Sequence, residues 1–212
     1  HGTMRNVIRF YEECTKNNIK SIVGCEFYFC PDVSIKDKSL THHLVLLAMN
    51  NEGYMNLKRL DTFAYNEDSY YYKPRIDWAA LQKYNKGLIC LSACMASIVN
   101  TENGEEWFKK YKELFGNRFY AEIQPLNIEK QWKYNEKVIS LARKYSVPLV
   151  VTTDAHYSTP EDRIYHSHWI RINGNQYHDD ENYIWSENEI RKTQWIPQNV
   201  IDECIENTEY IA

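Results

Sequence analysis

Hydrophobic residues follow two spacings along this chain, and the two spacings alternate. Short runs of apolar and β-branched residues, typical of buried strands, are separated by segments in which apolar residues recur about every three or four positions, as on a helix. The expected strands are residues 22–29, 44–49, 88–91, 119–124 and 149–153. Strands that alternate with helices through short connections are typical of a parallel α/β sheet, either open or closed into a barrel.

The segments between these strands predict helices. Helical spacing extends over residues 5–17, 52–64, 107–115 and 129–145, and a closing helix is expected around residues 200–208. Capping patterns mark the starts of shorter helices: Asp77 before Trp78, Thr159 before Pro160, and Ser186 with Glu189. Residues 173–182 are polar and rich in Asn and Asp, which predicts a long surface loop.

Composition narrows the class of protein. A length of 212 residues fits one domain, and 43% hydrophobic residues suffice for a sizeable core. A net charge of −4 argues against tight nucleic-acid binding by this piece alone. Six cysteines without a C-x-x-C pair or a secretory signal favour reduced thiols and a cytoplasmic location, and no apolar run is long enough to span a membrane. The chain starts at His1 rather than Met, so we expect an engineered, processed or partial chain.

The last expected strand is followed by a D-x-H pair, Asp154-Ala-His156. If the strand continued, both side chains would point to one face, because residues two apart share a face. A carboxylate and an imidazole that converge at the mouth of a parallel barrel form a metal-ligand pair. A tripeptide of this kind is a weak signal by itself, and a hydrogen-bonded loop is the alternative.

Further candidate ligands lie near the ends of other expected strands. Glu26 lies within a strand, where a buried carboxylate is costly unless it is paired or bound to metal. His43 starts a strand and has a structural alternative, and Cys94 by itself is better explained as a small buried residue. His1, at a chain end, would ordinarily be dismissed as disordered. Together these side chains suit Zn²⁺, Mn²⁺ or Fe²⁺.

Several motifs resemble one family. They are His1-Gly-Thr-Met4, Gly24-Cys-Glu-Phe-Tyr28, His43-Leu-Val-Leu-Leu-Ala48, Asn51-Glu-Gly-Tyr54, Tyr71-Tyr-Lys-Pro-Arg-Ile-Asp77, Gly87-Leu-Ile-Cys-Leu-Ser-Ala-Cys94, Phe115-Gly-Asn-Arg-Phe-Tyr120 and Val147-Pro-Leu-Val-Val-Thr-Thr-Asp-Ala-His-Tyr157. In this order they are similar to PHP domains (polymerase and histidinol phosphatase), and more narrowly to the branch found in bacterial DNA polymerase III alpha subunits. The segment Glu206-Asn-Thr-x-x-Ile-Ala212 resembles the exit from that domain. Histidinol-phosphate phosphatases share the fold, but the blocks at 51–57 and 71–77 favour the polymerase branch.

The resemblance implies a distorted (β/α)7 barrel with a divalent metal cluster, Zn²⁺ or Mn²⁺, at the carboxyl ends of its strands. Ligand positions of the family match His1, Glu26, His43, Cys94, Asp154 and His156. Asp154 and Glu26 would bridge metals, the three histidines would be terminal ligands, and Cys94 would favour zinc. Asp154, His156 and Glu26 are the implied catalytic residues.

The sequence also departs from the family. The opening H-x-H strand and its following Asp are absent, as is the Asp that usually precedes His1, and Pro125-Leu126-Asn127 replaces a block that relatives often carry after Gln124. We therefore expect residues 1–212 to be a partial PHP domain, incomplete at its amino end, with 173–212 as the exit segment toward the polymerase body. A separate chain or a longer molecule would supply the missing strand.

Two functions follow from the resemblance. The first is metal-dependent phosphoester hydrolysis, as a 3′→5′ exonuclease that proofreads within a replicative DNA polymerase. The second is a non-catalytic module that braces the polymerase and docks partners. The partners implied are the remainder of the polymerase and, through it, DNA, with no membrane. Arg75 is a candidate for phosphate contact, with a surface ion pair as its alternative. The Tyr70-Tyr71-Tyr72-Lys73 cluster could stack on bases or simply form a packed rim.

Overall fold

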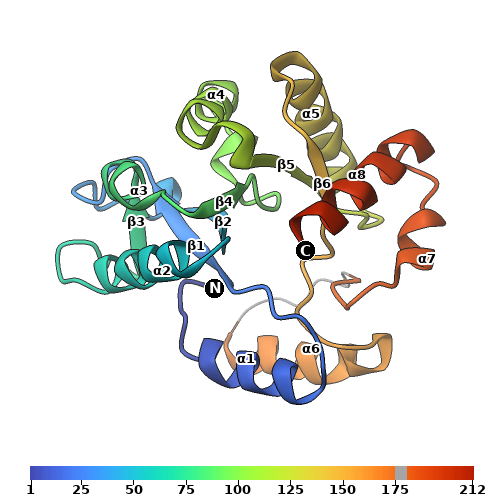
Figure 1. Cartoon of the computed structure of the whole chain (residues 1–212), viewed down its shortest axis with the longest axis horizontal. Coiled ribbons are helices and arrows are strands. Elements are labelled where there is room, and N and C mark those ends of the chain that lie inside the picture. Colours follow the sequence, from blue (N-terminus) through green and yellow to red (C-terminus); the bar gives the residue numbers. More distant parts are fainter. Residues whose placement is uncertain (175–180) are drawn as a thin grey trace.

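The sheet is the centre of the molecule. In this computed structural model, which describes residues 1–174 and 181–212, its strands follow the order β3-β1-β2-β4-β5-β6 (Figure 1). Their bounds are β1 Gly24–Cys30, β2 His42–Ala48, β3 Arg75–Asp77, β4 Leu88–Leu91, β5 Phe119–Ile123 and β6 Leu149–Val151. The architecture is mixed α/β, and within the described residues the sheet does not close into a barrel.

Helices cover the sheet and flank it. They are α1 Val7–Lys16, α2 Asn51–Ala64, α3 Trp78–Tyr84, α4 Gly104–Phe115, α5 Glu129–Tyr145, α6 Arg163–Ile172, α7 Glu187–Arg191 and α8 Gln198–Ile211, with 3-10 turns at Lys38–Leu40, Ile98–Asn100, Gly116–Arg118 and Pro160–Asp162. The expected caps are confirmed at Asp77 and Ser186. The expected loop at 173–182 lies mostly outside the described residues. Among the helices described, none is long and apolar enough to cross a membrane.

The expectation of a purely parallel sheet is wrong for β2. This strand runs antiparallel to both β1 and β4, whereas the β1–β3, β4–β5 and β5–β6 pairs are parallel. A parallel neighbour needs a crossover, usually a helix, and only residues 31–41 with one 3-10 turn connect β1 to β2. The short strand β3 was not expected, because three residues carry too little pattern to be recognised.

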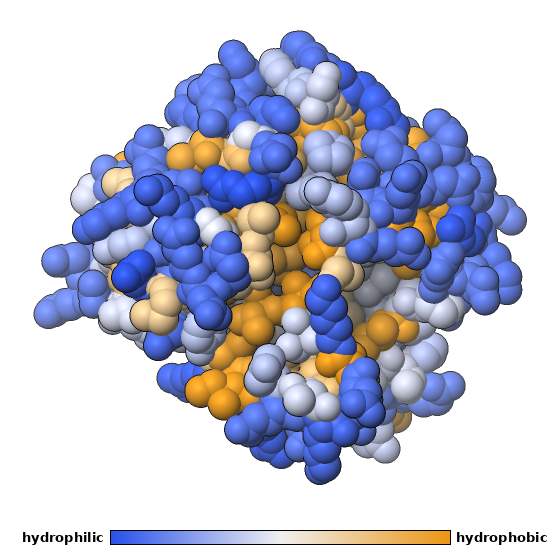
Figure 2. Space-filling view, in the orientation of Figure 1, coloured by the Kyte–Doolittle hydropathy of each residue, from blue (hydrophilic) through white to orange (hydrophobic). Residues whose placement is uncertain are grey.

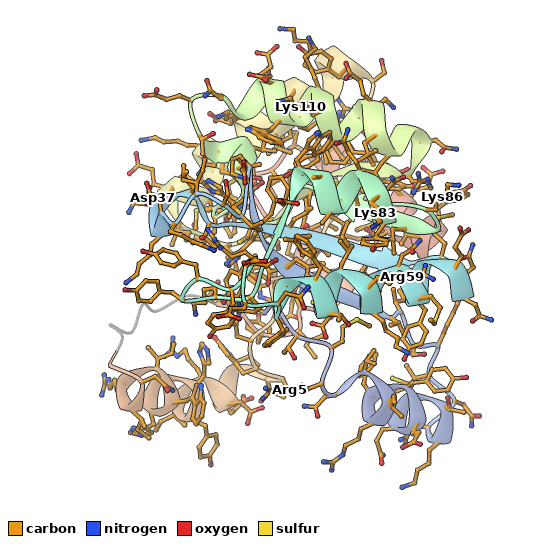
Figure 3. The ribbon with its side chains drawn as sticks, turned by 90° about the vertical axis from the view of Figure 1, so that its left-hand side faces the viewer. Arg5, Asp37, Arg59, Lys83, Lys86 and Lys110 are labelled. Atoms are coloured by element: carbon orange, nitrogen blue, oxygen red, sulfur yellow. The ribbon has the colours of Figure 1, made fainter. Side chains whose placement is uncertain are left out.

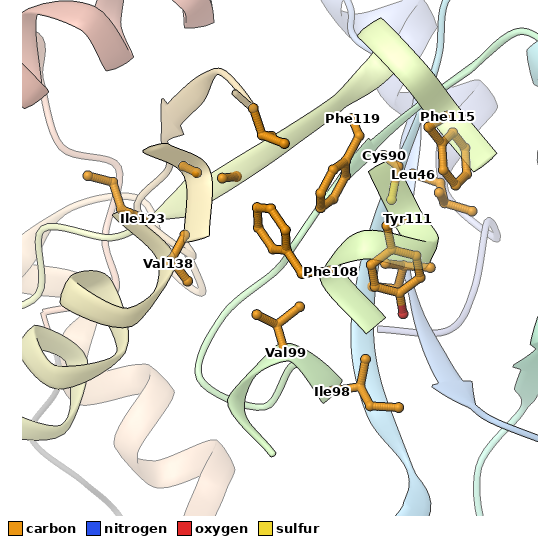
Figure 4. Packing of buried hydrophobic residues seen from close by; sticks show 14 of the residues in the cluster. Leu46, Cys90, Ile98, Val99, Phe108, Tyr111, Phe115, Phe119, Ile123 and Val138 are labelled. Carbon is orange, nitrogen blue, oxygen red and sulfur yellow. The ribbon is translucent and has the colours of Figure 1, made fainter. Parts of the chain in front are cut away.

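Alternation along the strands creates two different faces. We call the face covered by helices α2 to α5 the outer face, and the opposite one the inner face. Leu44 and Leu46 of β2 point outward into the main core, while Val45 and Leu47 point inward. On the outer face, Phe108 of α4 packs edge-on against Phe119 of β5, with ring centroids 5.0 Å apart (Figure 4).

The inner face is apolar but less well covered. Ile89, Leu91, Tyr120 and Val150 form a second, smaller cluster there, against which half-buried Val45, Leu47 and Ile211 pack. Figure 2 shows hydrophobic side chains gathered in a hollow near the centre of the molecule, where Figure 1 places the sheet and the C-terminus. Helices α1 and α6 lie on the other side of the sheet from α4 (Figure 3).

Arg75 is neither a surface ion-pair residue nor a phosphate ligand. Its side chain is fully buried, and its guanidinium donates to the backbone carbonyls of Ser69, Ile35 and Val33 at 3.2, 2.9 and 2.8 Å. The planar fork of donors suits this use, because it satisfies several carbonyls at once. Arg75 therefore fixes two loops against the start of β3, and its role is structural.

Candidate metal centre

The candidate centre is built around Glu26 on the inner face of β1. Residues Cys25 and Phe27 on either side point into the core, so alternation turns Glu26 inward. Its carboxylate pairs with the imidazoles of His1 and His43, the second at 2.9 Å. Burial by itself would raise the pKa of Glu26, but hydrogen bonds from the two histidines outweigh it and lower that pKa to about 2. The carboxylate is therefore ionised and available as a metal ligand.

His1 is held in place by its neighbour in the chain. The Gly2 amide donates to the Glu26 carbonyl at 2.7 Å, which fastens the amino-terminal segment to β1. Gly2 has a φ of +64°, and an added Cβ would lie 2.7 Å from the Tyr28 ring. Glycine is required here because only it accepts this conformation and this close approach. The hydrogen bond to Glu26 raises the pKa of His1.

His43 and Cys94 also lie beside the Glu26 carboxylate. His43 lies two residues before Val45 on β2, so its side chain also points inward. Its Nδ1 lies 3.3 Å from the Cys94 Sγ atom. Cys94 follows β4 and is buried, and its Sγ lies 3.9 Å from Glu26 Oε1. Burial raises the pKa of the Cys94 thiol well above its usual range. Without a bound cation the sulfur is thus a neutral thiol.

Asp154 and His156 reach the site from the loop that follows β6, and not from the strand itself. Strand β6 ends at Val151, and Asp154 has a φ of +45°, so the expectation that both side chains share a strand face is wrong. His156 Nδ1 instead donates to the Asp154 carbonyl at 2.6 Å, and its ring lies 5.5 Å from that of His1. Burial and the nearby Glu26 charge raise the pKa of Asp154. This loop brings both residues to the rim of the centre.

The donor set fits a divalent metal. Ligand atoms of His1, Glu26 and His43 all lie within 4.8 Å of one another. The Nδ1 of His156 donates to the Asp154 carbonyl, and metal-binding histidines fix their tautomer in this way. The Nε2 atom of His156 is then left to bind a metal. A cleft of about 750 Å³ opens over the centre and is lined by His1, Cys94, Asp154 and His156.

Glu122 is a buried acid that the sequence interpretation missed. It lies on the inner face of β5 and accepts hydrogen bonds from the Ala93 amide at 3.1 Å, from Thr152 and from Gln124. Burial is the main cause that raises the pKa of Glu122 to about 7. Through these hydrogen bonds Glu122 ties the loop that carries Cys94 to the end of β6. Tyr120 lies two residues earlier on β5 and points inward, so the two-residue alternation of the strand could have identified Glu122 as an inward-facing acid.

Comparison with known proteins identifies the family. The model of the PHP domain matches residues 1–125, which is more than half of the chain. The chain belongs to the PHP domain family. This confirms the expected fold class, and four of the six candidate ligands, His1, Glu26, His43 and Cys94, lie inside the matched PHP segment.

Relatives of this PHP domain are much longer proteins. The chain is 41% identical over 184 residues to the DNA polymerase III subunit alpha of Aquifex aeolicus, an alignment that covers 79% of this chain and 16% of that protein. Proteins of the same name from Borreliella burgdorferi and Treponema pallidum are 35% and 37% identical, over 100% and 77% of this chain. The chain spans 20% of the Borreliella protein and 15% of the Treponema one.

The burial of Glu122 predicts a pH-dependent effect of the Glu122→Gln substitution. The folded pKa of about 7 exceeds the ordinary 4.5, so the folded state favours the protonated acid, and ionisation destabilises it as pH rises from about 4.5 to 7. Glutamine cannot ionise. In EDTA-treated protein, we expect the variant to gain about 1–3 kcal/mol relative to the parent between pH 5 and pH 8, measured by urea unfolding. If the unfolding free energies of the variant and the parent differed by the same amount at pH 5 and pH 8, this account would be wrong.

Proposed function

We propose that this chain is the PHP module of a DNA polymerase III alpha subunit and serves DNA replication in the cytoplasm. The relatives that it resembles carry that name, and the similarity extends over most of the chain. All six cysteines are free, which supports a reducing compartment. The remainder of the polymerase and its DNA are then the natural partners of this module.

We propose that the module binds Zn²⁺ or Mn²⁺ through His1, Glu26, His43, Cys94, Asp154 and His156. The carboxylates and imidazoles suit both ions, and the Cys94 sulfur favours zinc. Glu26 holds two imidazoles in position, and the Asp154 carbonyl fixes the ring of His156. A divalent metal of this kind supplies a hydroxide nucleophile and polarises a phosphodiester.

The activity that this geometry supports best is 3′→5′ exonuclease hydrolysis for proofreading. The observation that carries it is an open cleft of about 750 Å³ that is lined by four candidate ligands, His1, Cys94, Asp154 and His156, and His1 in turn is grouped with Glu26 and His43. A purely structural metal is normally enclosed by its ligands, whereas a catalytic one keeps a position open to substrate. Here Asp154, His156 and Glu26 are the proposed catalytic residues, because they combine acid, base and ligand groups at one rim.

A second candidate is a non-catalytic module that braces the polymerase, and the open inner face favours it. Glu26, Val45, Leu47, Leu91 and Val150 line a cavity of about 420 Å³ on that face. Strands β3 and β6 end the sheet among the described residues. Another segment of the polymerase, adding a strand over this cavity, would cover the apolar surface and complete the barrel that the family implies.

The ligand assignment predicts loss of metal from an Asp154→Ala/His156→Ala double variant. After loading with Zn²⁺ or Mn²⁺ and gel filtration, elemental analysis should find metal in the parent chain and little in the double variant. His168→Ala is the matched control, because His168 is an exposed imidazole on α6 outside the cleft. Full metal retention in the double variant would defeat the assignment.

The proposed activity predicts slow removal of 3′-terminal nucleotides from a labelled single-stranded oligonucleotide by the metal-loaded chain. Glu26→Gln should abolish the reaction, because it removes the charge that holds His1 and His43. The same preparation should not extend a primer, since the chain spans at most 20% of the length of these polymerases. A metal-loaded parent without hydrolysis leaves the bracing role as the function.

The proposed added strand predicts that the stability cost of Leu47→Asp differs between this chain alone and the intact alpha subunit. Leu47 is half-buried on the inner face, so in this chain alone the substitution should cost about 1 kcal/mol or less. In the intact alpha subunit it should cost several times more, because the strand would bury the new charge. Leu46→Asp is the control and should unfold both, since Leu46 is fully buried in the main core. Equal costs of Leu47→Asp in both settings would exclude a covering strand.

A further inference from the structure

The cleft over the candidate centre is also lined by two residues that the metal assignment does not use. They are Lys73, from the segment before β3, and Trp169, from α6. His1, Asp154 and His156 line the same cleft. A cationic side chain and an aromatic one beside a candidate metal centre fit a ligand with an anionic and an aromatic part.

Lys73 is held near the centre by an aromatic ring. Its Nζ lies 5.1 Å from the centroid of the Tyr28 ring, and that ring lies 5.4 Å from the ring of His43. The cation–π contact restrains a side chain that would otherwise swing freely in solvent. Among the described residues Lys73 forms no ion pair, so its charge is available to an anion in the cleft.

Trp169 presents an unusually open aromatic surface. Its side chain is 65% exposed although it lines the cleft, and the only buried residue of its helix is Ser167. One turn before it, the ring of His166 lies 5.5 Å from that of His156, which places this face of α6 beside the centre. Aromatic side chains exposed in this way serve as platforms on which bases stack without regard to their identity.

We propose that this cleft is a binding site for the terminal nucleotide of a single-stranded nucleic acid, with Lys73 at its phosphate and Trp169 stacked on its base. The inference rests on the proposed function, whose substrate it specifies. A net charge of −4 disfavours tight binding along an extended strand, so we place the contact at a strand end. Lys73 and Trp169 are binding residues that set which end of a substrate reaches the metal ligands.

Fluorescence anisotropy tests the proposal with a 5′-fluorescein-labelled DNA 12-mer that ends in dA and has phosphorothioate linkages at its 3′ end to slow hydrolysis. In the Mn²⁺-loaded chain, Trp169→Ala should weaken binding about tenfold, and Trp169→Phe should retain most of it. Lys73→Ala should weaken binding and reduce the slope of log K against log salt by about 0.7, the value for one phosphate contact on a single strand.

Matched controls come from the same chain. Lys83 lies 5.2 Å above the ring of Tyr84 on α3, the same kind of contact as Lys73 makes, but away from α6 (Figure 3). Trp132 on α5 is 36% exposed and does not line the cleft. Lys83→Ala and Trp132→Ala should bind as the parent does. An oligonucleotide with an abasic 3′-terminal residue should bind the parent and Trp169→Ala equally.

Each outcome bears on the proposal separately from the proposed function. Parent binding that Trp169→Ala and Lys73→Ala leave unchanged, or no parent binding at all, overturns the terminal-nucleotide site even if hydrolysis occurs. Loss on Lys73→Ala alone overturns the base platform and indicates a general phosphate site. Binding with the expected losses but no hydrolysis of the unmodified strand supports the site and removes the exonuclease.

Discussion

The ionised carboxylate of Glu26 is the interaction on which the rest of the centre depends. A charge in this partly buried position is costly unless other groups compensate it, and the imidazoles of His1 and His43 do so from two separate segments. The amino-terminal segment, β1 and β2 are thereby tied together at one point. Cys94, Asp154 and His156 then gather around a group whose place is already fixed.

The two-residue period of the strands explains why the chemistry and the apolar inner face occur together. Outward positions of β1 and β2 fill the main core, so every inward position faces one shared space, whether it carries Glu26, His43, Val45 or Leu47. Ligands concentrate toward one end of that space, and aliphatic side chains occupy the remainder. The same alternation that builds the site leaves the hydrophobic surface beside it.

Sequence periodicity predicted most elements because their signals are local. Strand β4 and helix α5 have the expected bounds, and the capping residues begin α3 and α7 as expected. Predictions failed where the determining contact is distant. Arg75 is buried because it donates to the carbonyls of Ile35 and Val33, which lie 40 and 42 residues earlier in the chain. A contact over this separation leaves no signal in the local sequence pattern. The candidate ligands were found through motifs, whereas the left-handed backbone at Asp154 and the buried Glu122 depend on tertiary packing.

The antiparallel pairing of β1 with β2 has a consequence for the order in which the molecule folds. Residues 31–41 close a short loop, so this pair can form quickly and at low entropic cost, whereas β6 pairs with β5 across the longer segment 124–148, which contains α5. We expect substitutions in β1 and β2 to show high φ-values and those in β6 low ones. Glu26 would then meet His43 early, and the Asp154 loop would join a half-built centre last, so errors in late folding would impair the site before they impair the core.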